Sequence, residues 1–311
     1  MKTLVFALTG LFLAPLLQAQ SKPARPRVYG IAHYATKVAD IEQARAYYKD
    51  FLGFEEPFAL QNPDGTVSMA FIKINDYQYI ELSPGLKPEE DRQSHISFYT
   101  DDAEAMRAYL GANGLKVPDR VPRGRSRNLN FSVKDPDGHG VEIVQYMADG
   151  WALKNKGKFM PASRISQHIP HIGIIVGDVK AAQHFYGDIL GFQETWRGSA
   201  AGNTTVSWIN MRVPDGGDYV EFMLYKDLPA PDKRGTSHHI CLETPNIAQA
   251  VERLKARDYF FTYGKPADIR TGINRKRQMN LYDPDGTRAE LMEPMTVDGS
   301  APAPSTFPLP R

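Results

Sequence analysis

Four histidines and four glutamates recur at matching places along this sequence, and side chains of these two types bind metal ions. Each histidine lies in a short apolar stretch, and each glutamate follows about fifty residues later between apolar neighbours. Imidazole nitrogen and carboxylate oxygen suit Zn, Ni, Mn, Co or Fe(II), and two histidines with two glutamates leave coordination positions open for substrate or water. The sequence therefore predicts a divalent metal ion as cofactor. The eight predicted ligands are His33, Glu81, His95, Glu142, His171, Glu221, His239 and Glu290.

The recurrence of these pairs favours metal sites over two simpler interpretations. A single histidine in a strand is more often a hydrogen-bonded core residue, and a single glutamate in a strand usually points to solvent. Glu142, however, lies between Val141 and Ile143. Because side chains alternate between the two faces of a strand, this carboxylate faces away from its apolar neighbours.

Two adjacent histidines, His238 and His239, compete for one of the ligand positions. The segment "HISFYT" from His95 aligns with "HICLET", which begins at His239. Strand alternation sends the side chains of His238 and His239 to opposite faces. We therefore expect His239 to bind metal and His238 not to bind it.

The elements that carry these residues are themselves repeated. "HYATKVADIEQARAYYKDFLGF" from His33 aligns without a gap on "HIGIIVGDVKAAQHFYGDILGF" from His171, and the segments that begin at His95 and His239 also match. Each repeat begins with a short strand, continues with a helix started by Asp or Asn, and ends with β-rich stretches separated by turn residues. This pattern predicts four βαβββ modules, over residues 28–88, 92–148, 166–228 and 236–295.

A DPDG turn precedes the last strand of the second and fourth modules. It reads "DPDGHGVE" before Glu142 and "DPDGTRAE" before Glu290. Turn residues that repeat can be purely structural. We interpret the four aspartates in this way: Asp135, Asp137, Asp283 and Asp285.

The modules indicate an α+β protein with two domains. A chain of 311 residues can bury two cores of ordinary size. We expect the first domain at 28–148, a linker at 149–165, the second domain at 166–295 and a proline-rich tail at 296–311. If adjacent modules pair, one metal site takes the first four predicted ligands and the other takes the last four. A swapped arrangement would exchange partners across the linker, and it also gives two sites.

The N-terminus has the layout of a cleaved signal peptide. Lys2 precedes an apolar run over residues 4–17, and Ala19 supplies a small residue before a polar stretch. We expect cleavage near Ala19, removal of residues 1–19, and a secreted or periplasmic mature protein. An uncleaved membrane anchor is the alternative.

Composition limits the partners further. The formal charge of +1 gives no general electrostatic reason to expect nucleic acid or an anionic membrane. Cys241 is the single cysteine, so a disulfide framework and a CxxC metal site are excluded. We expect a monomer or homodimer that acts on a small molecule, with no membrane partner after signal cleavage.

On these motifs the sequence resembles the vicinal oxygen chelate superfamily, which includes glyoxalase I, the extradiol dioxygenases and the bleomycin-resistance proteins. The resemblance runs from about Val28 to Pro294 and is carried by the "H…FYxDxLGF" opening and the "DPDG…E" closing strand. It implies paired βαβββ modules that form open mixed β-barrels, each around one divalent metal. It also implies a substrate that chelates this metal through adjacent oxygens.

Within that superfamily, the ligand types favour the glyoxalase pattern of two histidines or glutamines and two glutamates. Extradiol dioxygenases use two histidines and one glutamate, with a further His and Tyr ahead of the closing turn. Here the stretches "RNLNFSVKDPDG" and "RQMNLYDPDG" lack that histidine, and Tyr282 lies directly before Asp283. These differences make ring cleavage a weaker interpretation than the glyoxalase pattern.

The expected activity is that of an exported, metal-dependent lyase, isomerase or epimerase of the lactoylglutathione lyase-like type. The metal would polarise a carbonyl, and a glutamate would act as general base at the adjacent C–H. Glu142 and Glu290 are the first candidates for this base, followed by Glu81 and Glu221. Two alternatives stay open: an Fe(II)-dependent ring-cleaving dioxygenase, and a metal-independent small-molecule binding or resistance protein.

Two basic loops precede the closing strands, "RVPRGRSRN" and "IRTGINRKRQ". The simpler interpretation is a solvated loop. The alternative is a lid whose arginines pair with a carboxylate or phosphate of the substrate. The candidate substrate contacts are Arg123, Arg127, Arg275 and Arg277, and Asn130 and Asn280 could face the cavity.

Overall fold

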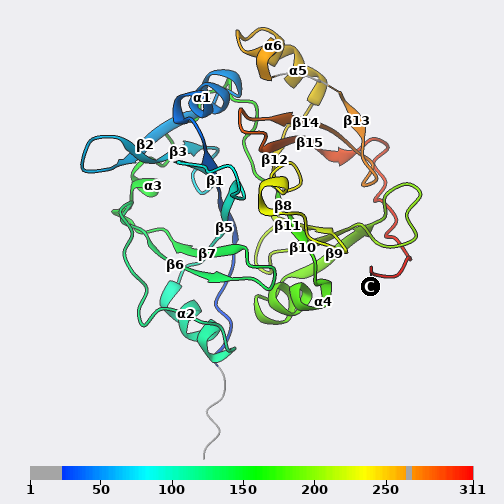
Figure 1. Cartoon of the computed structure of the whole chain (residues 1–311), viewed down its shortest axis with the longest axis horizontal. Coiled ribbons are helices and arrows are strands. Elements are labelled where there is room, and N and C mark those ends of the chain that lie inside the picture. The colour runs from blue at the N-terminus through cyan, green and yellow to red at the C-terminus, as the bar shows by residue number, and fades with distance from the viewer. Residues whose placement is uncertain (1–22, 264–267, 311) are drawn as a thin grey trace, which may run out of the picture.

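Two curled mixed sheets, each with helices against it, make up most of the protein (Figure 1). This computed structural model describes residues 23–263 and 268–310. The first sheet has seven strands in the order β2-β3-β4-β1-β5-β7-β6, and the second has eight in the order β13-β14-β15-β12-β8-β11-β10-β9. The predicted fold, an α+β protein with two glyoxalase-like domains, is confirmed.

The first sheet takes all its strands from the first two modules. The first module contributes β1 (Gly30–Val38), β2 (Glu55–Gln61), β3 (Val67–Lys73) and β4 (Tyr79–Pro84), and the second contributes β5 (Gln93–Tyr99), β6 (Leu129–Lys134) and β7 (Gly140–Gln145). β1 pairs antiparallel with β5, while β4 and β7 run parallel to β1 and β5. Adjacent modules therefore pair, and the first and last strands of both lie together at the centre.

The second sheet repeats this arrangement with the third and fourth modules. Its strands are β8 (His171–Val176), β9 (Gln193–Gly198), β10 (Trp208–Arg212), β11 (Tyr219–Leu224), β12 (His239–Glu243), β13 (Arg270–Thr271), β14 (Lys276–Tyr282) and β15 (Arg288–Thr296). β8 pairs antiparallel with β12, and β11 and β15 lie parallel to these two strands.

Four of the next five helices begin directly after an Asp or Asn. The five are α1 (Ile41–Arg45), which continues into a π-helical turn, η1 (Ala46–Phe51); α2 (Ala103–Ala112); α4 (Val179–Ala182), which continues into η2 (Gln183–Ile189); α5 (Ile247–Lys255) and α6 (Phe260–Tyr263). The side chains of Asp40, Asp102, Asp178 and Asn246 accept hydrogen bonds from backbone amides of the first turns. These caps satisfy amide groups that have no partner inside the helix.

The second module departs from the βαβββ order. After α2 only β6 and β7 follow, and the expected first strand is reduced to a single bridge between Arg123 and Leu129. Pro118 and Pro122 lie in this segment, and proline has no amide hydrogen to donate to a neighbouring strand.

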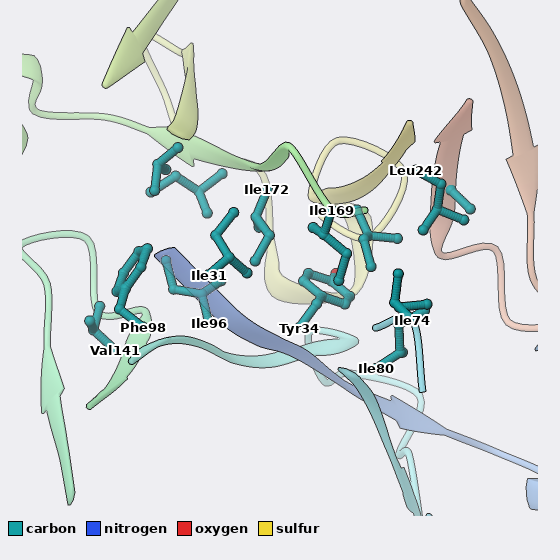
Figure 2. Close-up of a cluster of buried hydrophobic side chains, with 14 of the residues drawn as sticks. Ile31, Tyr34, Ile74, Ile80, Ile96, Phe98, Val141, Ile169, Ile172 and Leu242 are labelled. Atoms are coloured by element: carbon teal, nitrogen blue, oxygen red, sulfur yellow. The ribbon is translucent and has the colours of Figure 1, made fainter. Parts of the chain in front are cut away.

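The two sheets share one hydrophobic core. Figure 2 shows side chains of both domains in contact, including Ile31, Phe98 and Val141 from the first and Ile172 and Leu242 from the second. Each of these residues lies on a strand that also carries a predicted ligand. Side chains alternate between the two faces of a strand, and a register shift lies between Ile31 and His33 on β1, so the ligands lie on the faces turned away from this core.

The DPDG turns connect each domain to a helix of the other. The Tyr48 hydroxyl donates to Asp283 at 3.2 Å, and the Tyr186 hydroxyl donates to Asp135 at 3.0 Å. We call these two hydrogen bonds the tyrosine clasps. Asp137 and Asp285 accept from backbone amides of Gly177 and Ala39, also across the two domains. The structural interpretation of the four aspartates is confirmed.

Short helices also lie in the linker and before β12. They are α3 (Trp151–Lys154) and the 3-10 turn η3 (Pro231–Lys233). The proline-rich tail packs against the second domain, where Pro308 and Arg197 accept backbone hydrogen bonds that join the tail to residues near β9. No helix in the described ranges is long and apolar enough to cross a membrane.

Candidate metal centres

The first cluster of predicted ligands lies at the centre of the first sheet. His33, Glu81, His95 and Glu142 come from β1, β4, β5 and β7. The Nε2 atoms of the two histidines are 2.9 Å apart, and the carboxylate oxygens lie 3.4 to 3.8 Å from the histidine nitrogens. The four side chains therefore converge on one point.

The second cluster has the same construction. His171, Glu221, His239 and Glu290 come from β8, β11, β12 and β15. The histidine Nε2 atoms are 3.1 Å apart, and Glu290 Oε2 lies 3.2 Å from His171 and 3.6 Å from His239. Glu221 is held less closely, with one contact of 3.8 Å to His239. A Cβ at Gly173 would overlap the His239 ring, so this glycine makes room for the ligand.

The donor atoms in both clusters are spaced as in a metal coordination sphere. Ligands about 2.1 Å from a tetrahedral or octahedral ion lie about 3.0–3.5 Å from one another. His33, Glu81 and His95 each offer an atom within 4.8 Å of the other two, and so do His171, His239 and Glu290. Two imidazoles and two carboxylates at these distances fit Zn, Ni, Mn, Co or Fe(II). Both clusters can therefore hold a divalent ion.

Burial raises the pKa of three of the four ligand carboxyl groups. Burial and the nearby charge of Glu142 raise the pKa of Glu81 well above its usual range. Burial raises the pKa of Glu142 to about 7, although hydrogen bonds from Asn130 and Ser97 partly lower it. Burial also raises the pKa of Glu221, while Glu290, which two imidazoles contact, has a pKa well below the usual value despite its burial.

Burial keeps three of the ligand histidines neutral. It lowers the pKa of His33 well below its usual value, that of His95 to about 4, and that of His239 to about 3. A neutral imidazole has a lone pair available for a metal ion. Metal binding at pH 7 would thus release protons from Glu81 and Glu142, whose pKa values are raised, and leave His33, His95 and His239 neutral.

The structure places His239 in the second cluster and His238 outside it. The His238 ring lies edge-on to His139, with ring centroids 5.0 Å apart, and its Nε2 is 3.4 Å from Asp91. His238 therefore faces the junction between the domains, as the alignment with "HISFYT" predicts.

The two clusters differ sharply in the space above them. The first opens on a cavity of about 30 Å³, whereas the second opens on about 280 Å³. The linker closes the first cavity. Ala152 of α3 packs on Phe71 and Tyr79, and the ring centroids of Trp151 and Phe58 are 5.3 Å apart. The second cavity is walled by Trp196, Trp208, Arg270, Asn274, Gln278 and Arg288 above Glu221 and Glu290.

The groups that position the ligands also differ between the domains. Ser97 donates to Glu142 at 3.3 Å, and Asn130 donates to it at 2.9 Å. In the second sheet Cys241 takes the register position of Ser97. Gln278 lies twelve residues before Glu290, as Asn130 lies twelve before Glu142, and it lines the second cavity.

Asn280, for which a cavity position was expected, lies opposite Glu290 on β14. Its Oδ1 is buried without a hydrogen-bond partner in the described part of the chain, and so is the Oδ1 of Asn210, opposite Glu221. Two buried acceptors without a hydrogen-bond partner, both beside the second cluster, are consistent with an ion or water bound at that cluster.

The four arginines expected at a substrate lie away from both cavity walls. Arg123 pairs with Asp149, from which Arg127 is 4.0 Å distant, and Arg275 pairs with Asp298. Arg277 is exposed. In this structure the cations that line the second cavity are Arg270 and Arg288.

A profile of the Glyoxalase/Bleomycin resistance protein/Dioxygenase superfamily matches residues 30–143 and 168–291. These two segments carry all eight predicted ligands. The chain belongs to this superfamily. The resemblance noted from the sequence is thus confirmed, with one superfamily domain in each sheet.

Sequence relatives within the superfamily are distant. Glyoxalase I of Saccharomyces cerevisiae is 22% identical over 184 residues, which are 55% of this chain and 54% of the yeast protein. The chain thus spans about half the length of that relative. Lactoylglutathione lyase of Salmonella typhimurium is 26% identical over 134 residues, which are 40% of this chain and 98% of that enzyme.

Solved structures of the superfamily share the fold over nearly the whole chain. The Mn(II)-bound glyoxalase from Novosphingobium aromaticivorans has a TM-score of 0.65 and 19% identity, covering 92% of this chain and 89% of that one. The 2,3-dioxygenase LapB from Pseudomonas sp. KL28 has a TM-score of 0.65 and 18% identity, covering 92% and 98%. At these identities the likeness concerns the fold.

Several residues of the second site were not predicted from the sequence. Trp196, Trp208, Gln278 and Arg288 lack a repeated motif of their own. Arg288 could have been noticed, because the aligned turns "DPDGHGVE" and "DPDGTRAE" place it against Gly140. The roof formed by α3 gives no such signal, since a linker has no repeat to align with.

Proposed function

We propose that this protein is a divalent-metal-dependent enzyme of the glyoxalase, or lactoylglutathione lyase-like, type. It acts on a small oxygen-chelating substrate by removing a proton next to a carbonyl, as a lyase, isomerase or epimerase. The observation that carries this proposal is the second cluster, in which two imidazoles and two carboxylates converge below a cavity of about 280 Å³.

A divalent ion held by His171, Glu221, His239 and Glu290 would polarise the substrate carbonyl and stabilise the enediolate that forms when the proton leaves. Glu221 is the better base in this site. It makes one long contact with a histidine, whereas Glu290 contacts two. A carboxyl group of raised pKa is also closer to the pH at which proton transfer is efficient. Glu221 takes the proton from one carbon and returns it to the neighbouring carbon, so no oxidant is needed.

We assign the chemistry to the second site because the first has almost no room. A cavity of about 30 Å³ has room for only a few water molecules. Glu81 and Glu142 of the first site are proposed as metal ligands, with base chemistry only for a substrate that can displace the α3 roof.

An Fe(II)-dependent ring-cleaving dioxygenase is the second candidate. The fold shared with dioxygenases such as LapB favours it. The two carboxylates in each cluster argue against it, because the dioxygenase pattern has a single carboxylate. A metal-independent binding protein is the third candidate. Such a protein would not need eight ligand side chains that converge in two clusters.

Metal analysis combined with an anaerobic exchange assay tests these candidates. We expect the purified protein to bind divalent metal and to convert a 2-oxoaldehyde hemithioacetal or a 2-hydroxyaldehyde in D2O without oxygen, with deuterium incorporated next to the carbonyl. Glu221→Gln and Glu290→Gln should abolish turnover, and the exposed Glu252→Gln should not. Glu142→Gln should reduce turnover less than Glu290→Gln does.

Two outcomes would contradict the proposal. Turnover that requires oxygen and consumes it stoichiometrically would establish the dioxygenase. Tight binding of a small molecule that survives complete removal of metal by a chelator, with no turnover, would establish the binding protein.

We also infer export to the periplasm or the extracellular space. The supporting observation is the charged start, the apolar run over residues 4–17 and the small Ala19. These residues lie outside the part of the chain that the structure describes. The mature enzyme would then act away from the cytosolic thiol pool, which favours a sugar-, keto-acid- or aromatic-derived substrate over a glutathione adduct.

A further inference from the structure

Arg288 is the clearest chemical difference between the two metal clusters. It is the first residue of β15 and lies on the same strand face as Glu290, and both line the second cavity. Its register partner is the ligand His239, whereas the corresponding partner of His95 in the first sheet is Gly140. The second site therefore has a cation where the first has no side chain.

The guanidinium of Arg288 is fixed by neutral groups. Its Nη2 donates to the Ser237 carbonyl at 3.3 Å, lies 3.6 Å from Met223 Sδ and contacts the Nδ1 atom of His239. Its Nε is buried without a hydrogen-bond partner, and no carboxylate forms an ion pair with it within the described residues. Arg288 thus retains donors for an anion that the protein does not supply.

The two sites therefore also differ in charge. A divalent ion balances the two glutamates in each cluster. The first cavity then has no residual charge, because its walls contain no lysine or arginine among the described residues. The second keeps two positive charges: the exposed Arg270 on the cavity wall, and Arg288, which is the register partner of the ligand His239. Water is partly displaced from such a cavity, which strengthens the attraction for an anion.

We propose that the second site selects an anionic substrate in which a carboxylate is adjacent to a chelating hydroxyl or carbonyl oxygen, and that Arg288 is the specificity-determining residue. The carboxylate pairs with Arg288 while the neighbouring oxygen faces the four metal ligands. This inference rests on the proposed function, because it assumes a metal in the second cluster. It adds the class of substrate, a 2-hydroxy or 2-oxo acid.

Calorimetric titration of the Mn²⁺-loaded protein with glycolate and with its neutral analogue glycolamide tests the inference. We expect one glycolate to bind per chain, at least about tenfold more tightly than glycolamide, a difference of ~1.4 kcal/mol. Arg288→Gln should remove most of this selectivity, and Arg288→Lys should retain part of it, since lysine keeps the charge but not the planar fork. Arg212→Gln, which changes an exposed arginine on β10 that bonds Gln193, is the matched control.

The metal content of each preparation separates the two proposals. A wild-type protein that holds no metal would refute the proposed function itself. Two retained metals with equal affinities for glycolate and glycolamide would refute only the role of Arg288. The same holds if Arg288→Gln keeps its metal and the full selectivity. If Arg288→Gln releases metal, the selectivities of the wild-type protein and of Arg288→Lys for glycolate over glycolamide still test the role of Arg288.

Discussion

Ligands and core residues alternate along the central strands, and this alternation determines the chemistry of each position. Ile240 and Leu242 are fully buried in the shared core, while His239 on the same strand belongs to the second metal cluster. A substitution at a ligand should therefore change metal binding with little effect on the packing. A substitution at its neighbours should have the opposite effect.

Glutamine in place of one ligand glutamate should remove metal from one site only. Glu142→Gln and Glu290→Gln preserve the shape but remove a charge that offsets the dication, so affinity at that site should fall about tenfold or more. Elemental analysis should give one metal per chain for each single variant and none for the double variant, with unchanged circular dichroism. Two retained metals and full activity in the double variant would show that these glutamates are structural.

The adjacent histidines provide an internal control. His239→Ala should release the metal of the second site, because its Nε2 lies 3.1 Å from that of His171. His238→Ala should leave the metal content at two, because His238 faces His139 and Asp91. The reverse result, measured by elemental analysis, would place the wrong histidine in the cluster.

At this scale the ligands were predictable from the sequence, whereas their surroundings were not. The histidine and the glutamate each recur four times among apolar neighbours, so the sequence shows which strand face carries the ligands. Gln278 shows the limit. It is the counterpart of Asn130, but Asn280 was chosen because it matches in residue type. Both side chains lie on the strand face of Glu290, and only the three-dimensional structure shows that Gln278 lines the cavity.

At the scale of elements, the motif that ends each long helix acts across the domain junction. Tyr48 and Tyr186 are the tyrosines of the two "LGF" helices, and each clasps a DPDG aspartate of the other domain. The two motifs are therefore a matched pair, in which the helix supplies a donor and the turn supplies an acceptor.

Removal of either tyrosine clasp should destabilise the protein measurably. Tyr48→Phe or Tyr186→Phe leaves a buried carboxylate without one donor, which costs about 1–3 kcal/mol of unfolding free energy. Urea denaturation monitored by circular dichroism measures the loss. Tyr77→Phe is the control, because the Tyr77 side chain is exposed. Unfolding free energies equal to the wild-type value would show that the clasps contribute nothing.

A second connection at the junction should make stability depend on pH. His168 Nε2 lies 2.7 Å from Asp218, which also accepts from the Ile31 amide of the first domain. Burial lowers the pKa of His168, but the hydrogen bond with Asp218 and the nearby carboxylate of Glu243 outweigh it and raise the pKa to about 9. The ion pair should therefore stabilise the protein fully below pH 6.5, the usual histidine pKa, and lose this effect as pH rises to about 9.

His168→Gln tests this dependence, because glutamine cannot become charged. Thermal melts from pH 6 to pH 10 should show a smaller decrease in melting temperature for the variant than for the wild-type protein. The His168 side chain is 39% exposed, so solvent screens the pair and the effect should be modest. Parallel pH curves for the two proteins would rule out the ion pair of His168 and Asp218 as the source of the pH dependence.

The helices and most strands were predictable because capping residues and alternation are local signals. The missing strand of the second module and the α3 helix were not. Proline placement weakened the first, and α3 has only four residues, which is too short a segment to show helical periodicity in the sequence.

At the scale of the whole molecule, the pairing of the modules depends on the shared core. Adjacent and swapped pairings bring identical residue types together, so no local pattern distinguishes them. Ile31, Ile172 and Leu242 belong to one hydrophobic core only because the two sheets pack against each other (Figure 2). The sequence therefore predicted two sites without predicting which residues share one.

The export of the protein can be tested directly. Intact-mass measurement on protein recovered from its native host should show a mature chain that begins near Gln20. A full-length mass in the cytosol would contradict cleavage and restore the glutathione adduct as a candidate substrate.

The position of α3 has a consequence for dividing the protein into parts. The segment that joins the two domains is also the roof of the first cavity, since Ala152 packs on Phe71 and Lys73 donates to Asp76 and to the carbonyl of Asn155. A chain cut before residue 150 would yield a first half whose metal cluster is open to solvent, whereas a cut after residue 157 would leave it covered. The linker thus both joins the two domains and covers the first site, so an insertion that lengthens it would also alter which molecules reach that cluster of ligands.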